Sequence, residues 1–453
     1  MKSYDTVIIG AGPGGTKCAI DLASTGQKVA LIEKDALGGV CLNRGCIPSK
    51  SYLYLVELLE NIKKSKRHGL EIPEVKINWE DAKKRKDMNV KILGMGLRKS
   101  LEAKGVYIIE GEGILKSKNE VLVKTKDEEK ILEAKKIVLA IGTKPLFLSF
   151  MPKGKQVISS VEMLDLPEIP KSLVIIGGGV IGVEMASVFS GLGTEVMIIE
   201  KLNTLLPHQD REITDYLKKS LEKKSCKIYL NAEVLSAKDK DDKAEVIYKN
   251  YEGQEKTIIT DKVLMAIGRA LTYDIKEMEK IGIENDGRKI LLNKNLQTTV
   301  PNIYMIGDSA FRNLTAYGAE EEGEMVASHI LGKEKTIDYD KILVTVFSHP
   351  ELAQIGLTEE KAKVKGIDYE VKKSEYAANG KAIILTEREG LAKIIVEKQS
   401  QKILGVHIIG AHATDLIHQA LIPVMQEMTV PKWLEVVFGH PVLSEVLKNA
   451  LES

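Results

Sequence analysis

A short pattern of an apolar strand, a glycine-rich turn and the start of a helix occurs twice in this chain, and no other feature restricts the fold as strongly. The copies are Val7-Ile8-Ile9-Gly10-Ala11-Gly12-Pro13-Gly14-Gly15 and Ile175-Ile176-Gly177-Gly178-Gly179-Val180-Ile181-Gly182. In each copy a second apolar strand ends on an acidic residue 23 positions after the first glycine, Glu33 before Lys34 and Glu200 before Lys201. One glycine-rich turn is a weak signal, but two copies in this context predict two βαβ units that bind dinucleotides.

The glycines of each copy have separate physical tasks. The first permits a tight turn, the second lets the backbone approach a pyrophosphate, and the third lets the helix pack on the strand. These are Gly10, Gly12 and Gly15 in the first copy and Gly177, Gly179 and Gly182 in the second. A carboxylate at the end of the second strand accepts hydrogen bonds from ribose hydroxyls and repels a 2′-phosphate. We therefore expect Glu33 to bind an adenosine ribose and Glu200 to favour NAD over NADP.

Later strand ends predict how the domains are connected. Apolar strands end in glycine at Val138 to Thr143 and again at Val263 to Arg269, as expected where a chain crosses between nested domains. From about Tyr339 the pattern changes to short alternating strands and helices. The predicted fold class is α/β, with two nested Rossmann-like dinucleotide-binding domains plus a C-terminal α+β domain. The predicted domains are residues 1–145 with 269–337, residues 146–268, and residues 338–453.

The composition is ordinary and argues against several classes of partner. Of 453 residues, 44% are hydrophobic and 28% are charged, and 65 basic against 64 acidic side chains leave a net charge of +1. Neither nucleic acid nor a membrane is therefore indicated as a partner. The apolar run from Leu173 to Ile199 contains two glutamates and several glycines, which favours a buried βαβ unit over a membrane span. The first five residues lack the features of a targeting segment, so we expect a cytoplasmic protein.

Two of the four cysteines, Cys41 and Cys46, lie close together in a glycine-containing segment. In an ideal α-helix, residues five apart have Cα atoms more than ~8 Å apart, beyond the ~7 Å reach of a disulfide. A bridge between these cysteines therefore needs a distorted turn, for which Gly45 gives the backbone freedom, and a strained bridge is easily reduced. This favours redox chemistry. The alternatives are a zinc site, which would want further ligands nearby, and buried thiols without a role, and we predict no metal site.

A candidate general base lies near the C-terminus, at His440. Pro441 is a residue that can open a helix, and Glu445 follows about one turn later, where its carboxylate can meet the imidazole. Oxidation of a dithiol needs a group that takes a proton near neutral pH, so that a thiolate can attack a disulfide, and histidine suits this task. The alternative is a structural or exposed histidine, since the chain has eight.

The segment GGVCLNRGCIPSK, which ends at Lys50, resembles the active-site signature of the pyridine nucleotide-disulfide oxidoreductases. Its CIPSK ending is most similar to the dihydrolipoyl dehydrogenases within that family, and the likeness extends over essentially the whole chain. The resemblance implies that Cys41 exchanges with dihydrolipoamide and that Cys46 is the charge-transfer thiolate under the flavin of FAD. It further implies that Lys50 lies beside the flavin, paired with Glu184, and that the HPxLSE motif supplies the catalytic pair of His440 and Glu445.

The same resemblance implies cofactor contacts, partners and a reaction. Contacts to FAD are expected at Lys34, Gly113, Asp308 and Ala316, and contacts to NAD at Val234 and Gly268. A homodimer is expected, in which the C-terminal domain forms the interface and the His-Glu pair reaches the partner's disulfide. Electrons would pass from protein-bound dihydrolipoamide through the Cys41–Cys46 disulfide and FAD to NAD. The lipoyl arm would belong to another protein, a 2-oxo acid dehydrogenase-type acyltransferase or a glycine-cleavage carrier.

Other enzymes of this scaffold and one non-enzymatic role are the alternatives. A glutathione-type or other small disulfide reductase usually has basic residues for a 2′-phosphate where this chain has Glu200. A mercuric reductase would carry a further cysteine pair near the C-terminus, but no cysteine follows Cys226. A flavin-bearing structural or binding subunit would be expected to have lost part of the cysteine and His-Glu set. The chain departs from the usual family pattern at Ala270-Leu271-Thr272 and at Tyr317-Gly318.

Overall fold

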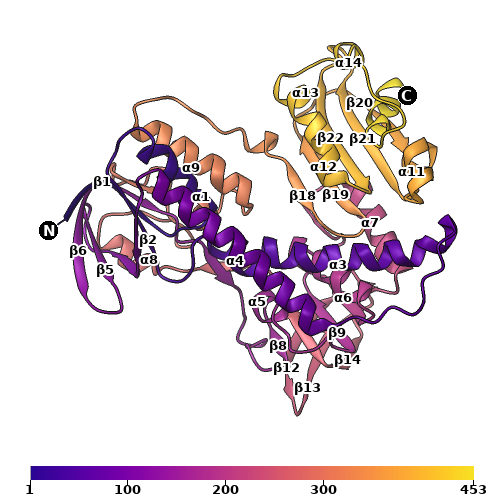
Figure 1. Cartoon of the computed structure of the whole chain (residues 1–453), viewed down its shortest axis with the longest axis horizontal. Coiled ribbons are helices and arrows are strands. Elements are labelled where there is room, and N and C mark those ends of the chain that lie inside the picture. The colour runs from indigo at the N-terminus through magenta and orange to yellow at the C-terminus, as the bar shows by residue number, and fades with distance from the viewer. Residues whose placement is uncertain (1) are drawn as a thin grey trace. The chain divides into compact units, whose positions relative to one another are not determined.

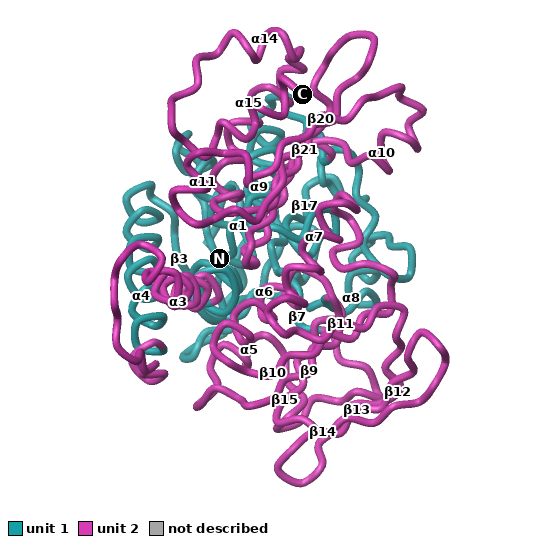
Figure 2. The backbone as a smooth tube through the Cα atoms, turned by 90° about the vertical axis from the view of Figure 1, so that its right-hand side faces the viewer, with its two compact units in different colours: residues 1–48, 83–145, 269–339 teal, residues 49–82, 146–268, 340–453 magenta. Residues whose placement is uncertain are grey.

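The computed structural model describes residues 2–453, so that Met1 of the predicted first domain lies outside the described residues. Helices and strands follow one another in the order that the two repeated βαβ patterns predict (Figure 1). The chain divides into two compact units (Figure 2). Unit 1 contains the residues up to Pro48, Lys83–Pro145 and Arg269–Tyr339, and unit 2 contains Ser49–Ala82, Leu146–Gly268 and Asp340–Ser453.

Unit 1 is built on a seven-stranded sheet that begins with the first repeat. Its parallel strands are β1 (Lys2–Ile9), β2 (Val29–Glu33), β3 (Tyr107–Glu110), β6 (Glu129–Leu139) and β17 (Ile303–Met305). Two antiparallel strands, β5 (Glu120–Lys124) and β4 (Glu112–Leu115), complete the order β3-β2-β1-β6-β5-β4, with β17 beside β6. The register sets Ile8 opposite both Leu31 and Val138, so the apolar centre of β1 is paired on both edges.

Alternate residues of these strands face two different cores. Ile8 and Leu31 pack under two helices that lie side by side, α1 (Pro13–Ala23) and α9 (Ala316–Ile330) (Figure 1). Their neighbours Val7, Ile9 and Ile32 point to a second core on the other face. This alternation is the period of an extended strand, and burial on both faces explains why the strands are apolar throughout.

The middle of unit 2 repeats this parallel arrangement. Its five-stranded sheet has the order β11-β10-β9-β15-β8 and is parallel throughout. The strands are β8 (Val157–Ile158), β9 (Ser172–Ile176), β10 (Glu195–Ile199), β11 (Lys227–Tyr229) and β15 (Lys262–Met265), with helices α5 (Ser160–Met163), α6 (Val180–Gly191) and α7 (Arg211–Lys223). An antiparallel sheet of β12 (Glu233–Lys240), β13 (Lys243–Lys249) and β14 (Glu255–Thr260) follows α7. The run from Leu173 to Ile199 is the predicted βαβ unit, and across residues 2–453 no helix is long and apolar enough to cross a membrane.

The C-terminal part of unit 2 has a different, antiparallel architecture. Its sheet order is β18-β19-β22-β21-β20, formed by β18 (Val344–Val346), β19 (Glu351–Gly356), β22 (Ile403–Gly410), β21 (Gly390–Glu397) and β20 (Tyr369–Glu375). Its helices are α10 (Glu359–Val364), α11 (Gly380–Leu385), α12 (Ala413–Leu416), α13 (Leu421–Met425), α14 (Val430–Leu434) and α15 (Glu445–Glu452). The predicted fold class, two Rossmann-like sheets plus a C-terminal α+β domain, is confirmed.

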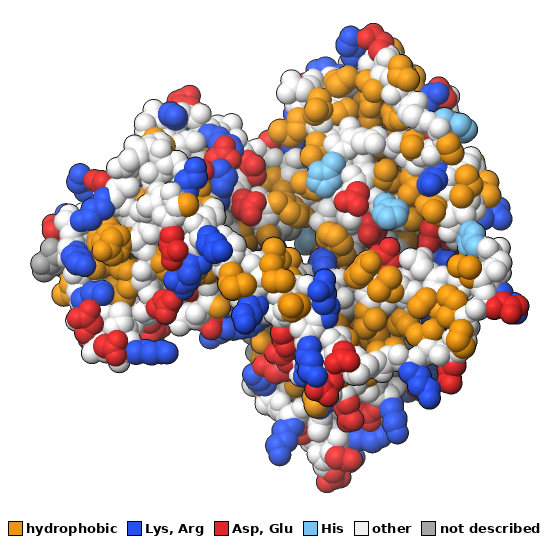
Figure 3. Space-filling view, viewed as in Figure 1, with side chains coloured by type: hydrophobic (Ala, Val, Ile, Leu, Met, Phe, Trp, Pro, Cys, Tyr) orange, Lys and Arg blue, Asp and Glu red, His pale blue; other side chains and the backbone are white. Residues whose placement is uncertain are grey.

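Large apolar side chains remain exposed on this C-terminal part, where Figure 3 shows apolar surface gathered over the strands and helices that follow β18. They include Ile383, Ile384, Ile422, Met425, Val436 and Val437. Apolar surface of this kind is typical of a face that another subunit covers.

Residues 49–82, which the predicted division includes in the first domain, group instead with unit 2. Helix α3 (Cys46–Ser65) contributes Tyr52 and Val56 to the same core as α6 and α7. Trp79, at the start of α4 (Trp79–Ala103), stacks on the Tyr52 ring with centroids 4.7 Å apart. This packing accounts for the grouping, and the division into three domains stays a prediction.

Two short strands bind together the segments where the chain crosses between units. Strand β7 (Thr143–Pro145) pairs with β16 (Arg269–Leu271), and the N–H of Leu146 donates to the carbonyl of Gly268 at 3.2 Å. Thr272, at a departure from the family pattern, donates through Oγ1 to the carbonyls of Ile141 at 3.1 Å and Gly142 at 2.9 Å. The unusual residue therefore still ties the two crossings together.

Candidate active site

The first glycine turn, between β1 and α1, has the shape that a dinucleotide site requires. A Cβ atom at Gly10, which has φ +102°, would lie 2.2 Å from the carbonyl oxygen of Ala140, and one at Gly15 would lie 2.0 Å from that of Gly10. A Cβ atom at Gly12 would meet nothing within 4 Å, and Gly12 is the N-cap of α1 without a side-chain cap. Open space therefore lies before an uncapped helix N-terminus, which fits a pyrophosphate.

The second turn, between β9 and α6, has the same construction. Gly177 has φ +107°, and its Cβ would lie 2.4 Å from the carbonyl oxygen of Ala266; a Cβ at Gly182 would lie 2.1 Å from that of Gly177. Gly179 is the N-cap of α6, again with open space around its Cβ position. Both copies thus combine two glycines that packing requires with one that faces empty space.

The acidic residues that end the second strands both accept hydrogen bonds from backbone N–H groups of the glycine turn in the same βαβ unit. Glu33 accepts from the N–H of Ala11 at 2.8 Å, and burial raises the pKa of Glu33 above its usual range. Glu200, which is 9% exposed, accepts from the N–H groups of Gly178 at 2.6 Å and Leu202 at 2.7 Å. A carboxylate oxygen can accept more than one hydrogen bond, so both residues can still bind ribose hydroxyls. Lys34 is exposed.

The cysteine segment of unit 1 contains the interruption that its spacing requires. Cys41 lies in the short helix α2 (Gly39–Arg44), and Cys46 is the first residue of α3. Between them Gly45 has φ −141° and ψ −104°, which are not helical values, and a Cβ there would lie 3.0 Å from the carbonyl oxygen of Val40. Both cysteines are partly exposed. The break places them on separate helices rather than on successive turns of one.

This segment is fastened to the first glycine turn. The N–H of Gly38 donates to the carbonyl of Ala11 at 2.7 Å. A Cβ atom at Gly39 would lie 2.9 Å from the Cα of Gly12, so the backbones approach too closely for any other residue at Gly39. Arg44 also forms an ion pair with Asp35, just after β2. The two cysteines and the first dinucleotide turn are therefore parts of one site within unit 1.

The pair of Lys50 and Glu184 is formed within unit 2. The Nζ of Lys50, one turn after Cys46 on α3, donates to both carboxylate oxygens of Glu184 at 2.9 and 2.8 Å. Glu184 lies on α6 and is only 4% exposed. The N–H of Phe347 donates to the same carboxylate at 3.0 Å. Of the two residues, Glu184 is fixed by burial, while the ammonium group reaches it from a partly exposed side chain.

Asp308 is connected to two residues that the sequence did not single out as site residues. Its Oδ2 accepts from Oγ1 of Thr143 at 2.8 Å, and Nε of Arg269 donates to that Oγ1 at 2.8 Å. Asp308 therefore ends a chain of hydrogen bonds, in the 3-10 turn Gly307–Ala310. The sequence offers one indication of this role: Thr143 and Arg269 each directly follow a glycine at the end of a strand where the chain crosses between domains.

A buried carboxylate supports the same turn. Glu322 of α9 has no exposed surface, and it accepts from the N–H of Gly307 at 2.6 Å and from the hydroxyl of Tyr339 at 2.9 Å. Burial raises the pKa of Glu322 to about 7. Its neighbours in sequence are also acidic, so composition gives no hint of which glutamate is buried.

The remaining residues expected to contact cofactors occupy varied positions. Gly113 lies on β4, where a Cβ would meet the side chain of Ile9 at 2.9 Å, so packing alone requires glycine there. Ala316 is the first residue of α9, Val234 lies buried on β12, and Gly268 has φ +125° with open space around it. Among residues 2–453, no group of three or more histidine, cysteine or acidic side chains could hold a metal ion.

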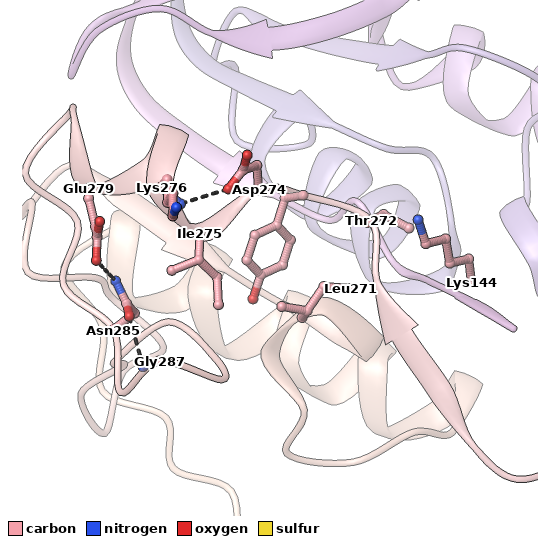
Figure 4. A pocket seen from close by; sticks show the side chains of 10 residues that line it. Lys144, Leu271, Thr272, Asp274, Ile275, Lys276, Glu279, Asn285 and Gly287 are labelled. Carbon is pink, nitrogen blue, oxygen red and sulfur yellow. Dashed lines mark hydrogen bonds between the residues drawn. The ribbon is translucent and has the colours of Figure 1, made fainter. Parts of the chain in front are cut away.

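Figure 4 shows an open depression of unit 1 beside the departure at Leu271 and Thr272. Some of its polar side chains have hydrogen-bond partners among the residues that line it. Asp274 caps the short helix α8 (Ile275–Glu279) by accepting the N–H of Lys276 at 2.8 Å, and Asn285 donates to Glu279 at 2.8 Å. We therefore assign no ligand to this depression.

His440 and Glu445 of unit 2 meet, but not in the way that the sequence predicts. Nδ1 of His440 lies 3.0 Å from Oε1 of Glu445, whose Oε2 accepts from the N–H of Val442 at 3.0 Å. The hydrogen bond with His440 holds the pKa of Glu445 below its usual range. The prediction that Pro441 opens a helix is wrong, because α15 begins only at Glu445. The His440 side chain is 78% exposed.

Models of protein families match two parts of the chain. Residues 4–323 match the pyridine nucleotide-disulphide oxidoreductase model, and residues 342–451 match the dimerisation domain of the pyridine nucleotide-disulphide oxidoreductases. Together these matches cover both glycine turns, the cysteine segment and the His-Glu pair.

Named relatives and solved structures that are similar to this chain support the same family. Dihydrolipoyl dehydrogenase 1, mitochondrial, from Arabidopsis thaliana is 38% identical over 452 residues, covering 98% of this chain and 89% of that protein. Dihydrolipoyl dehydrogenase from Geobacillus stearothermophilus is 36% identical and covers 99% and 95%. The HOCl-induced flavoprotein disulfide reductase RclA from Escherichia coli matches with a TM-score of 0.87 at 27% identity, covering 99% of each chain. LpdA from Mycobacterium tuberculosis, 22% identical with a TM-score of 0.91, shares the fold, covering 100% of this chain and 99% of that one.

Proposed function

This chain belongs to the pyridine nucleotide-disulphide oxidoreductase family, and we propose that it oxidises protein-bound dihydrolipoamide to lipoamide while reducing NAD to NADH. It is an oxidoreductase, and the dihydrolipoyl dehydrogenases to which it is similar use FAD and NAD. The observation that carries the proposal is the break at Gly45, which separates the helix of Cys41 from the helix that Cys46 begins, in a segment whose Gly38 is hydrogen-bonded to the first glycine turn.

The residues of both turns fit the two cofactors. We propose that FAD occupies the first turn, where Gly12 leaves open space, Glu33 meets the ribose, and Asp308 is aligned by Thr143. NAD would occupy the second turn, at Gly179 and Glu200. Glu200 supports NAD rather than NADP, because its buried charge would repel a 2′-phosphate.

The chain's own residues can carry out the dithiol chemistry. His440 takes a proton from a thiol of dihydrolipoamide, while Glu445 orients its imidazole. The resulting thiolate attacks the sulfur of Cys41 in a Cys41–Cys46 disulfide, and Cys46 leaves as a thiolate. The second thiol of the substrate then attacks the substrate sulfur of the mixed disulfide and passes its proton to the departing Cys41, which closes the lipoamide ring. The substrate has then lost two electrons, which are on the cysteine pair, and two protons, which are on His440 and Cys41. FAD, when bound, would supply the two-electron exchange between this dithiol and NAD.

The partners follow from the dimerisation domain and from the substrate. The chain carries the family's dimerisation domain, which supports a homodimer. We propose that His440 and Glu445 of one subunit serve the cysteines of the other, since His440 is largely exposed and apolar side chains lie exposed nearby at Val436 and Val437. The lipoyl arm would come from an acyltransferase of a 2-oxo acid dehydrogenase-type complex or from a glycine-cleavage carrier, in the cytoplasm.

The test is NADH formation from dihydrolipoamide and NAD, followed by absorbance. Rapid formation is expected for the purified protein and is expected to be lost in Cys46→Ser, whereas the matched control Cys226→Ser, at a buried cysteine of unit 2, should retain it. Reduction of oxidised glutathione with NADPH, without oxidation of dihydrolipoamide, would overturn the substrate and favour the reductase alternative.

A further inference from the structure

The ion pair of Lys50 and Glu184 has a third participant, Phe347, which the sequence did not single out. The Nζ of Lys50 lies 4.5 Å from the centroid of the Phe347 ring. The backbone N–H of the same residue donates to Oε1 of Glu184 at 3.0 Å. Phe347 therefore contacts both ions, the ammonium through its ring and the carboxylate through its backbone.

The segment that carries Phe347 is held on α6 independently of its ring. It lies between β18 and β19, and the N–H of His349 donates to Oγ of Ser187 at 3.1 Å. Glu184 and Ser187 are three residues apart, which places them on one face of α6. Nζ of Lys224 also donates to the carbonyl of His349 at 3.2 Å. The backbone hydrogen bonds of this segment therefore position the Phe347 ring next to Lys50 without any contribution from the ring itself.

The ring supplies a restraint that the carboxylate alone does not. The Glu184 side chain is 6% exposed but that of Lys50 is 30% exposed, so the lysine is the mobile member of the pair. A lysine has a flexible stem with several rotamers, and a carboxylate accepts an ammonium from many directions. An aromatic face within about 6 Å of the ammonium adds an attraction with a defined direction.

We propose that Phe347 is a positioning residue, whose ring and N–H together hold the Lys50 ammonium and the Glu184 carboxylate in one arrangement during the redox reaction. The inference rests on the proposed function, which gives the Lys50–Glu184 pair its role. Phe347 lies within the match to the dimerisation domain, residues 342–451. The part of the chain that pairs subunits therefore also shapes an ion pair of its own subunit.

The geometry is tested by NMR on the FAD-loaded protein with ¹³C-methylated lysines. The resonance that Lys50→Arg removes identifies Lys50. Because this group lies over a ring, we expect its signal upfield of those of exposed lysines, and we expect Phe347→Leu to reverse the ring-current shift. Phe150→Leu, at an exposed phenylalanine of the same unit, is the matched control and should leave the signal in place. An unmoved Lys50 signal in Phe347→Leu would overturn the proposal.

The consequence for chemistry is tested by a double-mutant cycle on flavin reduction by NADH, measured by stopped flow. Phe347→Leu keeps the backbone N–H and should slow the reduction about 3-fold to 10-fold. In a Lys50→Met background the same change should add no further slowing, because the ring then has no ammonium to hold. Phe347→Tyr, which keeps the ring, should restore the rate. Equal slowing in both backgrounds, or a slow Phe347→Tyr protein, would show a role in folding alone and refute the proposal.

Failure of this inference can be told apart from failure of the proposed function. Flavin reduction by NADH needs no dithiol substrate, so the cycle can be read even in a protein that does not oxidise dihydrolipoamide. Such a protein would disprove the substrate while leaving the role of Phe347 to be decided by the cycle and the NMR shift.

Discussion

Unit 1 and unit 2 each bury one carboxylate completely, but they give it different partners. Glu322 of unit 1 accepts hydrogen bonds from a backbone N–H and a tyrosine hydroxyl, and burial raises its pKa to about 7. Asp210 of unit 2 accepts from Nζ of the buried Lys393 at 2.7 Å. Burial acts to raise the pKa of Asp210, but the charges of His407 and Lys393 outweigh it, and the pKa lies below its usual range.

The two carboxylates therefore respond to pH in opposite windows. Because the folded-state pKa of Glu322 lies above its ordinary 4.5, its contribution to stability is complete at low pH and is lost as pH rises towards about 7. The folded-state pKa of Asp210 lies below its ordinary 3.8, so its contribution is present above that pH and is lost as pH falls below it. In unit 1 burial dominates, and the protonated form of the buried carboxyl is favoured. In unit 2 the buried carboxylate is held in its charged form by a cluster of charged side chains.

The largest effect is expected when the cluster in unit 2 is broken by Lys393→Met. Nζ of Lys393 lies within 3.2 Å of carboxylates of Asp210, Glu212 and Glu359, and removing it leaves buried negative charge unpaired. We expect a loss of about 3 to 5 kcal/mol in the free energy of unfolding. Urea unfolding followed by tryptophan fluorescence measures it, because both tryptophans, Trp79 and Trp433, belong to unit 2.

The matched control is Lys398→Met, which removes an exposed lysine paired with the exposed Asp368 and should change the unfolding curve little. If Lys393→Met were as stable as the unchanged protein, the contrast between the units would be wrong, since both would then tolerate a buried carboxylate without a cation.

The next largest effect is expected in unit 1, with Glu322→Gln. A pKa raised from 4.5 to about 7 corresponds to about 3 kcal/mol of stability lost as pH rises through that window. A neutral amide does not ionise, so the variant should not show this loss. Release of FAD during urea unfolding at pH 5 and at pH 9 would report the stability of the proposed flavin site in unit 1. Glu321→Gln, which changes a half-exposed neighbour, serves as the control, and parallel pH curves for Glu322→Gln and the unchanged protein would refute the assignment.

Substitution of the glycines that face open space should affect a different cofactor in each unit. We expect Gly12→Val to lose FAD and Gly179→Val to keep FAD while binding NADH about 100-fold more weakly, a cost of ~2.7 kcal/mol. The reason is that a Cβ atom at either position would meet no protein atom within 4 Å, so the added side chain enters the space before its own helix, where the ligand would bind. Flavin absorbance and NADH titration measure the two effects. Gly96→Val, at an open position in the middle of α4, is the control; loss of the same cofactor from both variants would contradict the assignment of one cofactor to each turn.

The smallest effect is expected from the two strand-end acids. Glu200→Gln keeps an acceptor for the backbone but removes the charge, so the preference for NADH over NADPH should fall about 10-fold, or ~1.4 kcal/mol. Glu33→Gln should leave this preference unchanged and should weaken FAD retention instead. Initial rates of flavin reduction with the two nucleotides give the ratio, and an equal shift in both variants would mean that the turns are not specialised.

The glycine turns and the break between the cysteines could be predicted from the sequence because each follows from a local steric rule. At Gly10 and Gly177 the backbone lies so close to the carbonyls of Ala140 and Ala266 that a side chain would not fit. Glycine is therefore needed at these positions, and its spacing in the sequence predicts the turns. A distorted turn near Gly45 was expected because cysteines five residues apart on a regular helix lie beyond the reach of a disulfide, and the backbone there is not helical. The ion pair of Lys50 with Glu184 was expected through the family resemblance, and the structure forms it.

Residues whose role depends on distant packing were not predictable. Glu322 lies among Glu320, Glu321 and Glu324, and the sequence does not show which of them meets the distant Gly307 and Tyr339 in the folded chain. Phe347 reaches Glu184 across 163 positions of sequence. The helix predicted at Pro441 begins only at Glu445, because a proline suited to the first turn of a helix does not by itself fix where the helix starts.

The paired crossing strands β7 and β16 give the middle of the chain the character of an insertion. The chain leaves at Pro145 and returns at Arg269, and these two residues are partners in the same short ladder, so entry and exit lie side by side. A segment whose ends meet in this way can be inserted without separating the strands that flank it. In evolutionary terms, residues 146–268 are connected as an inserted segment is, and the core that α6 and α7 share with α3 ties this segment to residues outside it.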